Sequence, residues 1–183
     1  MRDKRFIAEH RGGSLTKEQH KHLILWACKC VEHILLYYTK TIDNRLANAL
    51  EIARNWTKDN ASVGQARQAS LNAIEVAQES KDQIEIAIAR SIGHAVATAH
   101  MADHSLIAVK YALKAVKLAH KSIDMERKYQ DENLSRDIVD LVLTARDKQA
   151  GAAAVADLVS LGCDAHTFQL EVTNPDDIEK CAN

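Results

Sequence analysis

Apolar residues recur every three or four positions along most of the first 147 residues, which is the spacing of one helical face. The first predicted helix covers about 16–39, and the second opens at Asp43 and ends near Asn60. The remaining pattern predicts a third helix from Ser62 past Ala77, a fourth from Asp82 past Ala99, a break near 102–105, a fifth to about Lys121, and a sixth from Leu134 to about Asp147.

Helix-start signals coincide with these stripes. Thr16 with Gln19, and Ser62 with Gln65, have the spacing of capping boxes. The chain contains 28 alanines but only one proline, six glycines and eight aromatic residues, a composition that favours packed helices over a turn-rich sandwich or barrel. The short connections favour antiparallel neighbours. We therefore expect an all-α, antiparallel helical bundle of about six helices, with a short α/β-like C-terminal appendage.

The end of the chain has a different character. Residues 150–183 hold one lysine and six acids, whereas residues 1–149 hold 23 basic and 19 acidic residues. Gly151–Leu161 reads as a short helix and His166–Val172 as a strand that lacks a partner. We expect 1–149 to form a helical domain and 150–183 to be a separate appendage. The helical domain should fold without this appendage.

Charge and cysteine usage narrow the functional classes. The formal net charge of −1 gives no overall electrostatic drive toward nucleic acid. No apolar run approaches the roughly 20 residues of a membrane span. Cys28 and Cys30 are two apart on a predicted helix and face different sides, a poor arrangement for a disulfide or a metal clip. These features predict a cytoplasmic protein with reduced thiols and no cofactor.

The densest group of ionisable residues comprises His94, His100, Asp103 and His104. His100 and His104 are four apart, which on a continuous helix places both on one face, a spacing that also suits two metal ligands. The glutamate of an H-E-x-x-H motif is absent, so hydrolytic zinc is not indicated. The competing interpretation is a buried histidine network between helices, or an Asp103 helix cap.

A second group, His20, His22 and His33, lies on the predicted first helix. Arg11, His22 and Trp26 could line a pocket against the fourth helix, although His22 could also belong to an ordinary helix surface. The ridge of Lys110, Lys114, Lys117 and Lys121 reads as a solvated face, and its alternative is a surface for an anionic partner.

Several of these segments resemble a known family. They are Arg11–His20 continuing to Trp26–His33, Gly93–His104 continuing to Tyr111–Val116, the intervening Ser62–Arg67, and the closing Glu126-Arg-Lys-Tyr-Gln130. Together, over about 10–149, they resemble the Imm-five-like immunity proteins of bacterial polymorphic toxin systems. The resemblance implies a helical fold and a protein that binds and neutralises a cognate toxin.

The tail has a resemblance of its own. Leu141–Asp147, Ala152–Leu158 and Phe168–Pro175 resemble a fragment of the short-chain dehydrogenases, in which the Arg146-Asp147 pair would contact the adenosine ribose and Glu171 would lie near adenine. The chain contains neither G-x-G-x-x-G nor Tyr-x-x-x-Lys. We therefore expect no binding of NAD(P).

The leading hypothesis is a non-catalytic helical protein that binds a cognate protein toxin, and no nucleic acid or membrane. One alternative is a small histidine- or metal-dependent enzyme that uses the 94–104 segment. The other is a self-associating helical module, which would form a homo-oligomer.

Overall fold

The computed structural model describes residues 3–146, and these residues form an all-α fold, as the sequence predicts. A single isolated bridge between Ala8 and Leu15 is their only β-type pairing. Three short 3₁₀ helices accompany the α-helices: η1 (Lys4–Phe6), η2 (Glu9–Arg11) and η3 (Leu35–Tyr37). The α-helices are α1 (Lys17–Ile34), α2 (Asn44–Thr57), α3 (Val63–Glu79), α4 (Gln83–Ala97), α5 (His104–Leu118) and α6 (Ile123–Glu132), and a further helical segment begins at 139.

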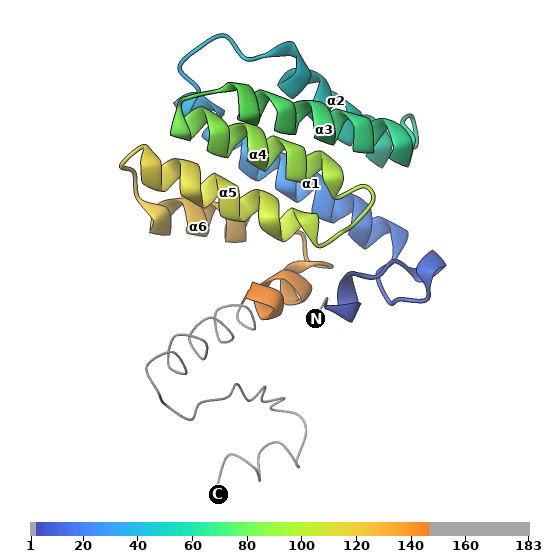
Figure 1. The fold of residues 1–183 in the computed structure, drawn as a ribbon. Coiled ribbons are helices and arrows are strands. Elements are labelled where there is room, and N and C mark those ends of the chain that lie inside the picture. Colours follow the sequence, from blue (N-terminus) through green and yellow to red (C-terminus); the bar gives the residue numbers. More distant parts are fainter. Residues whose placement is uncertain (1–2, 147–183) are drawn as a thin grey trace, which may run out of the picture. The chain divides into compact units, whose positions relative to one another are not determined.

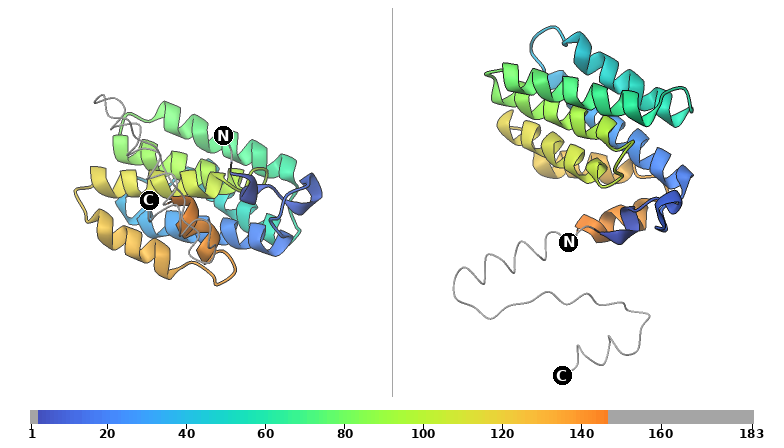
Figure 2. Two further views of the ribbon diagram at one scale, coloured as in Figure 1. Left: turned by 90° about the horizontal axis from the view of Figure 1, so that it is seen from below. Right: turned by 45° about the vertical axis from the view of Figure 1, so that its right-hand side comes forward.

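The six helices form two layers (Figure 1). Helices α3, α4 and α5 follow one another in one layer, and α2, α1 and α6 form the other. Helix α1 packs against α2, α4, α5 and α6, so it lies at the centre of the second layer. Two further views show the same order (Figure 2). Among residues 3–146, no helix is both long and apolar enough to cross a membrane.

The predicted helix starts are confirmed where capping chemistry is explicit. Both capping boxes form: Thr16 caps α1 with Gln19, and Ser62 caps α3 with Gln65. The core between the layers is rich in buried alanine, which allows helix axes to approach closely. Helix α1 ends earlier than the expected residue 39, because the chain tightens after Ile34 into η3.

The sixth predicted helix is misplaced. The region 122–133, to which no helix was assigned, contains α6, while residues 134–138 are non-helical and the next helix starts at 139. The residues expected to form the separate appendage, 150–183, lie outside the described residues.

Two adjacent positions before α1 require glycine, each for a different structural reason. Gly12 has φ +79, a left-handed conformation that favours glycine. A Cβ on Gly13 would lie 1.9 Å from the carbonyl oxygen of Ile7. The backbone at Ile7 thus lies too close to position 13 for any residue with a side chain to fit there.

We expect Gly13→Ala to destabilise the N-terminal loop by about 1–3 kcal/mol, because backbone atoms must move to accept the methyl group. Trypsin cleavage at Arg5 and Arg11 should accelerate, and the melting temperature should fall. Gly64→Ala is the matched control, since its Cβ would meet nothing closer than 3.7 Å. Equal cleavage rates for the two variants would contradict the prediction.

Candidate functional site

The histidine-rich segment lies at the turn between α4 and α5. Helix α4 ends at Ala97, so the expected continuous helical face for His100 and His104 is wrong: His100 lies in the turn and His104 opens α5. The turn nevertheless brings three imidazoles together. Nδ1 of His94 lies 3.0 Å from Nδ1 of His104, and the His100 and His104 ring centroids are 5.1 Å apart.

His94 is partly buried beside an aromatic ring and a guanidinium group. Its ring stacks on Tyr111 with centroids 5.5 Å apart, and the guanidinium of Arg90 lies 5.7 Å from the centre of the same tyrosine. Burial lowers the pKa of His94 to about 4, and the neighbouring His104 and Arg90 act in the same direction. The neutral imidazole is therefore the stable form of His94 at physiological pH.

Of the other predicted site residues, some lie at the histidine segment, and others contact the chain at Gln130 and Asp137. Arg11 Nη1 donates to the backbone carbonyl of His100 at 3.5 Å, so Arg11 does reach the histidine segment. His22 Nδ1 instead lies 2.6 Å from Oδ2 of Asp137, and Trp26 Nε1 donates to the Gln130 carbonyl at 2.8 Å. Asp103 occupies the N-cap position of α5, but its side chain makes no capping hydrogen bond.

The cavity beside the histidine segment is small. It has a volume of about 70 Å³, and Arg11, His20, Trp56 and His100 contribute to its walls. His20 Nε2–H donates to the Thr98 carbonyl at 2.6 Å, because a carbonyl oxygen only accepts, and burial lowers the pKa of the His20 ring. Ligand pockets are typically about 300–1,000 Å³, so this cavity suits a few water molecules rather than a substrate.

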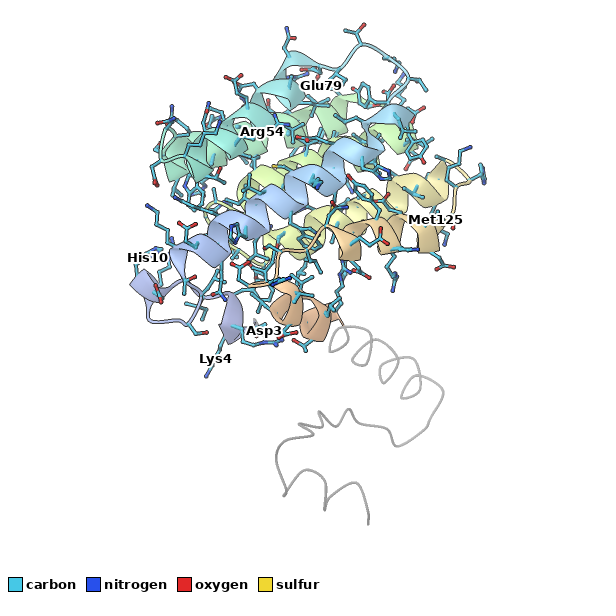
Figure 3. The ribbon with its side chains drawn as sticks, turned by 180° about the vertical axis from the view of Figure 1, so that it is seen from behind. Asp3, Lys4, His10, Arg54, Glu79 and Met125 are labelled. Atoms are coloured by element: carbon cyan, nitrogen blue, oxygen red, sulfur yellow. The ribbon has the colours of Figure 1, made fainter. Side chains whose placement is uncertain are left out.

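A larger groove lies at the other end of α1. Its volume is about 420 Å³. It is walled by the end of α1 with η3, by the end of α5 with the following turn, and by α6. The lining residues are His33, Tyr37, Val116, Lys121, Ser122, Met125, Glu126, Lys128, Tyr129 and Glu132. Figure 3 shows Met125 on α6, far from His10, which precedes the start of α1.

A histidine–carboxylate pair forms the floor of this groove. Nδ1 of His33 lies 2.7 Å from Oε2 of Glu126, and the Glu126 side chain is only 2% exposed. The Tyr129 ring stacks on His33 with centroids 3.7 Å apart and planes at 12°. Because Nδ1 contacts the carboxylate and Tyr129 covers one ring face, the orientation of the His33 ring is restricted where it lines the groove.

The pair belongs to a buried polar network that attaches α6. Gln130 Nε2 donates to Glu126 Oε1 at 3.1 Å and to the Val109 carbonyl at 3.3 Å. The Gln130 carbonyl in turn accepts the hydrogen bond from Trp26. Helix α6 is therefore joined to α1 and α5 by directional hydrogen bonds.

The comparisons with known proteins give one match. A family model described as "Imm-5 like putative immunity protein" matches residues 13–137. The chain belongs to this Imm-5-like family. No curated protein and no solved structure matches it. The match contains all six helices of the Imm-5-like domain, with both the histidine segment and the groove.

The comparisons give no support to the dehydrogenase resemblance of the tail. Its residues beyond 146 lie outside the described part of this Imm-5-like protein. Within residues 3–146, no three His, Cys, Asp or Glu side chains are grouped so that they could hold a metal ion.

Sequence reasoning about this Imm-5-like protein missed the groove because α6 carries no apolar stripe. Its buried residues, Glu126 and Gln130, are both polar. The available signal was their spacing of four, which places both side chains on one helical face, within the Glu126–Gln130 segment that resembles the family.

The enclosed His94 predicts a pH dependence of stability for the Imm-5-like domain. Its folded pKa lies below its unfolded value, so stability is complete above about pH 6.5 and is lost as the pH falls toward 4. Because the ring is only partly buried, we expect a loss of about 1–2 kcal/mol after allowing for solvent screening. Thermal melts between pH 7.5 and 4.5 measure it.

His94→Phe keeps an aromatic ring against Tyr111 and removes the titrating group. The melting temperature of this variant should depend less steeply on pH, and a residual slope is expected because burial also lowers the pKa of His20. A variant with the same slope as the wild type would show that His94 does not contribute.

Proposed function

We propose that this Imm-5-like protein neutralises a protein toxin by binding it, and that the groove between α1, α5 and α6 is the binding surface. Membership of an immunity-protein family supports the toxin as the class of partner. The observation that supports this surface is the 420 Å³ groove, fixed by hydrogen bonds beneath and edged by an exposed apolar side chain.

Met125 is that side chain. It is 69% exposed, the largest exposure among the large apolar side chains of the described residues. Exposed apolar residues beside a concave surface are typical of protein interfaces, where burial of such an anchor contributes much of the affinity. Steric occlusion of the toxin by a preformed surface requires no catalytic group.

The histidine segment supports catalysis less well, because the adjoining cavity of about 70 Å³ does not accommodate a substrate. Arg11, His94, His100, Asp103 and His104 are retained as a second candidate contact surface. His100→Ala distinguishes the two roles: a structural residue lowers stability and toxin binding together, whereas a contact residue lowers binding alone.

The proposed function is tested by co-expression with toxin domains of polymorphic toxin systems, starting with any that is encoded beside the gene for this chain. We expect the chain to restore growth to cells that the toxin domain alone arrests. Met125→Glu should abolish protection and weaken binding of the purified domain by about tenfold or more, because the variant places a charge in a desolvated contact.

Leu71→Glu is the matched control. Leu71 is 52% exposed on α3, and α3 packs on α2 and α4, away from the groove. This variant should protect cells as well as the wild type does. Loss of protection in both variants, or in neither, would contradict the assignment of the groove, and a chain that binds no toxin would contradict the proposed function. Size-exclusion chromatography at several concentrations tests the self-association alternative.

A further inference from the structure

The outer face of α5 carries an unbalanced row of lysines. Lys110, Lys114 and Lys117 follow one another at spacings of four and three, so they share one stripe opposite the buried face of α5. Lys121 lies in the turn after the helix, beyond the left-handed His120. All four are exposed, and none forms an ion pair with another residue among 3–146. We call these four residues the lysine ridge.

Several lysines elsewhere in the described chain form ion pairs with acidic residues. Lys17 and Lys21 pair with Asp59, and Lys40 pairs with the buried Glu85. Lys58 and Lys81 are unpaired among residues 3–146 as well, so the ridge differs from other basic positions in gathering several unpaired lysines along one helix and the turn that follows it. Four adjacent positive charges repel one another, and an opposite charge from outside relieves that repulsion.

The ridge leads into the groove. Lys121 belongs to both, since it is the last ridge residue and also lines the groove. The acids of the groove do not neutralise it: Glu126 is buried against His33, and Glu132 lies 3.7 Å from Lys128. A partner that enters the groove beside Met125 therefore passes next to the ridge.

We propose that the toxin presents an acidic segment to this surface, with carboxylates along the lysine ridge and an apolar side chain in the groove against Met125. This inference rests on the proposed function and specifies the chemistry of the partner. The fixed His33 ring forms the floor on which the apolar side chain packs, and the lysines supply orientation and a faster encounter.

The surroundings favour a protein over a nucleic acid. Asp124, Asp131 and Glu132 are distributed along α6, which packs against the helix that carries the ridge. A phosphate backbone is a uniform line of negative charge and is repelled by such acids, whereas a protein can place its carboxylates only where the lysines are.

The test measures, by calorimetry at low and high salt, the affinity for the toxin domain that the co-expression experiment identifies. The double variant Lys114→Glu/Lys117→Glu should bind about tenfold or more weakly at low salt and lose most of its salt dependence. The matched control is Lys58→Glu/Lys81→Glu, which makes the same charge change at exposed lysines around α3 and should bind within about twofold of the wild type. Circular dichroism confirms that both variants are folded.

Position 125 gives a second, independent readout. Met125→Lys and Met125→Glu both lose the apolar anchor, but only the glutamate repels an acidic partner. The lysine variant should therefore bind more tightly than the glutamate variant at low salt, and the two should converge at high salt.

The outcomes separate the two proposals. Binding that depends on Met125 but not on the ridge lysines would overturn this inference and leave the proposed function intact. Absence of any toxin binding would overturn both. Binding of an RNA or DNA duplex with the same lysine dependence, at equal or higher affinity than the toxin domain, would assign the ridge to nucleic acid and overturn the inference.

Discussion

Trp26→Ala is expected to destabilise the domain by about 3–5 kcal/mol, the range found for deleting a buried aromatic side chain. Trp26 is 2% exposed, so the substitution leaves a large cavity at the centre of the second layer. It also removes the hydrogen bond to the Gln130 carbonyl, which attaches α6. The melting temperature should fall by roughly 10 °C for a domain of this size.

Trp26→Phe separates the two contributions. Phenylalanine retains most of the apolar surface but cannot donate to the Gln130 carbonyl, so we expect a loss of about 1–2 kcal/mol. Chemical denaturation of both variants gives the free energies. If the alanine variant were no less stable than the phenylalanine variant, the packing described for Trp26 would be wrong.

His33→Ala has the second large expected effect, about 2–3 kcal/mol. The reason is the carboxylate that it leaves behind: Glu126 is buried and would retain only the hydrogen bond from Gln130. Removing one partner of a buried pair is more damaging than the net contribution of the pair suggests, because the remaining charge is desolvated without compensation. Loss of the stack with Tyr129 adds to the effect.

A double-mutant cycle with Glu126→Gln tests this explanation. When the charge is already absent, removal of His33 should be less damaging, so the double variant should be more stable than the sum of the single effects predicts. Free energies of unfolding in urea provide the measurement. Strict additivity would mean that His33 and Glu126 do not interact energetically.

The sequence predicts most of the fold because most of the helices bury an apolar face, which the spacing of apolar residues reveals. Helices α1 to α4 combine an apolar stripe with a capping side chain, and α5 has the stripe alone; these signals are visible without coordinates. The break between α4 and α5, predicted near 102–105, is confirmed before His104, but the way in which the histidines meet across it is less accessible to this reasoning. His100 and His104 have the spacing of helical neighbours, yet they meet through a turn that only tertiary packing defines.

Helix α6 and the groove could not be predicted from hydrophobicity for a different reason. The residues that α6 buries are a glutamate and a glutamine, whose partners lie 93 positions away at His33 and 21 positions away at Val109. A periodicity argument registers apolar side chains only, so it assigns such a helix to solvent. Hydrogen bonds over these separations become apparent only when the helices are in place.

The polar attachment of α6 has a consequence for the motions of the domain. A buried hydrogen bond can be replaced by a hydrogen bond to water, whereas buried apolar surface has no such replacement. We therefore expect α6 to detach locally while α1 to α5 stay packed. Its amide protons should exchange with solvent through this local opening, ahead of those of α4, which lies in the alanine-rich core. One wall of the groove is thus held less cooperatively than the other two. We therefore expect the amides of α6 to exchange before those of α1 and α5, which form the other two walls of the groove.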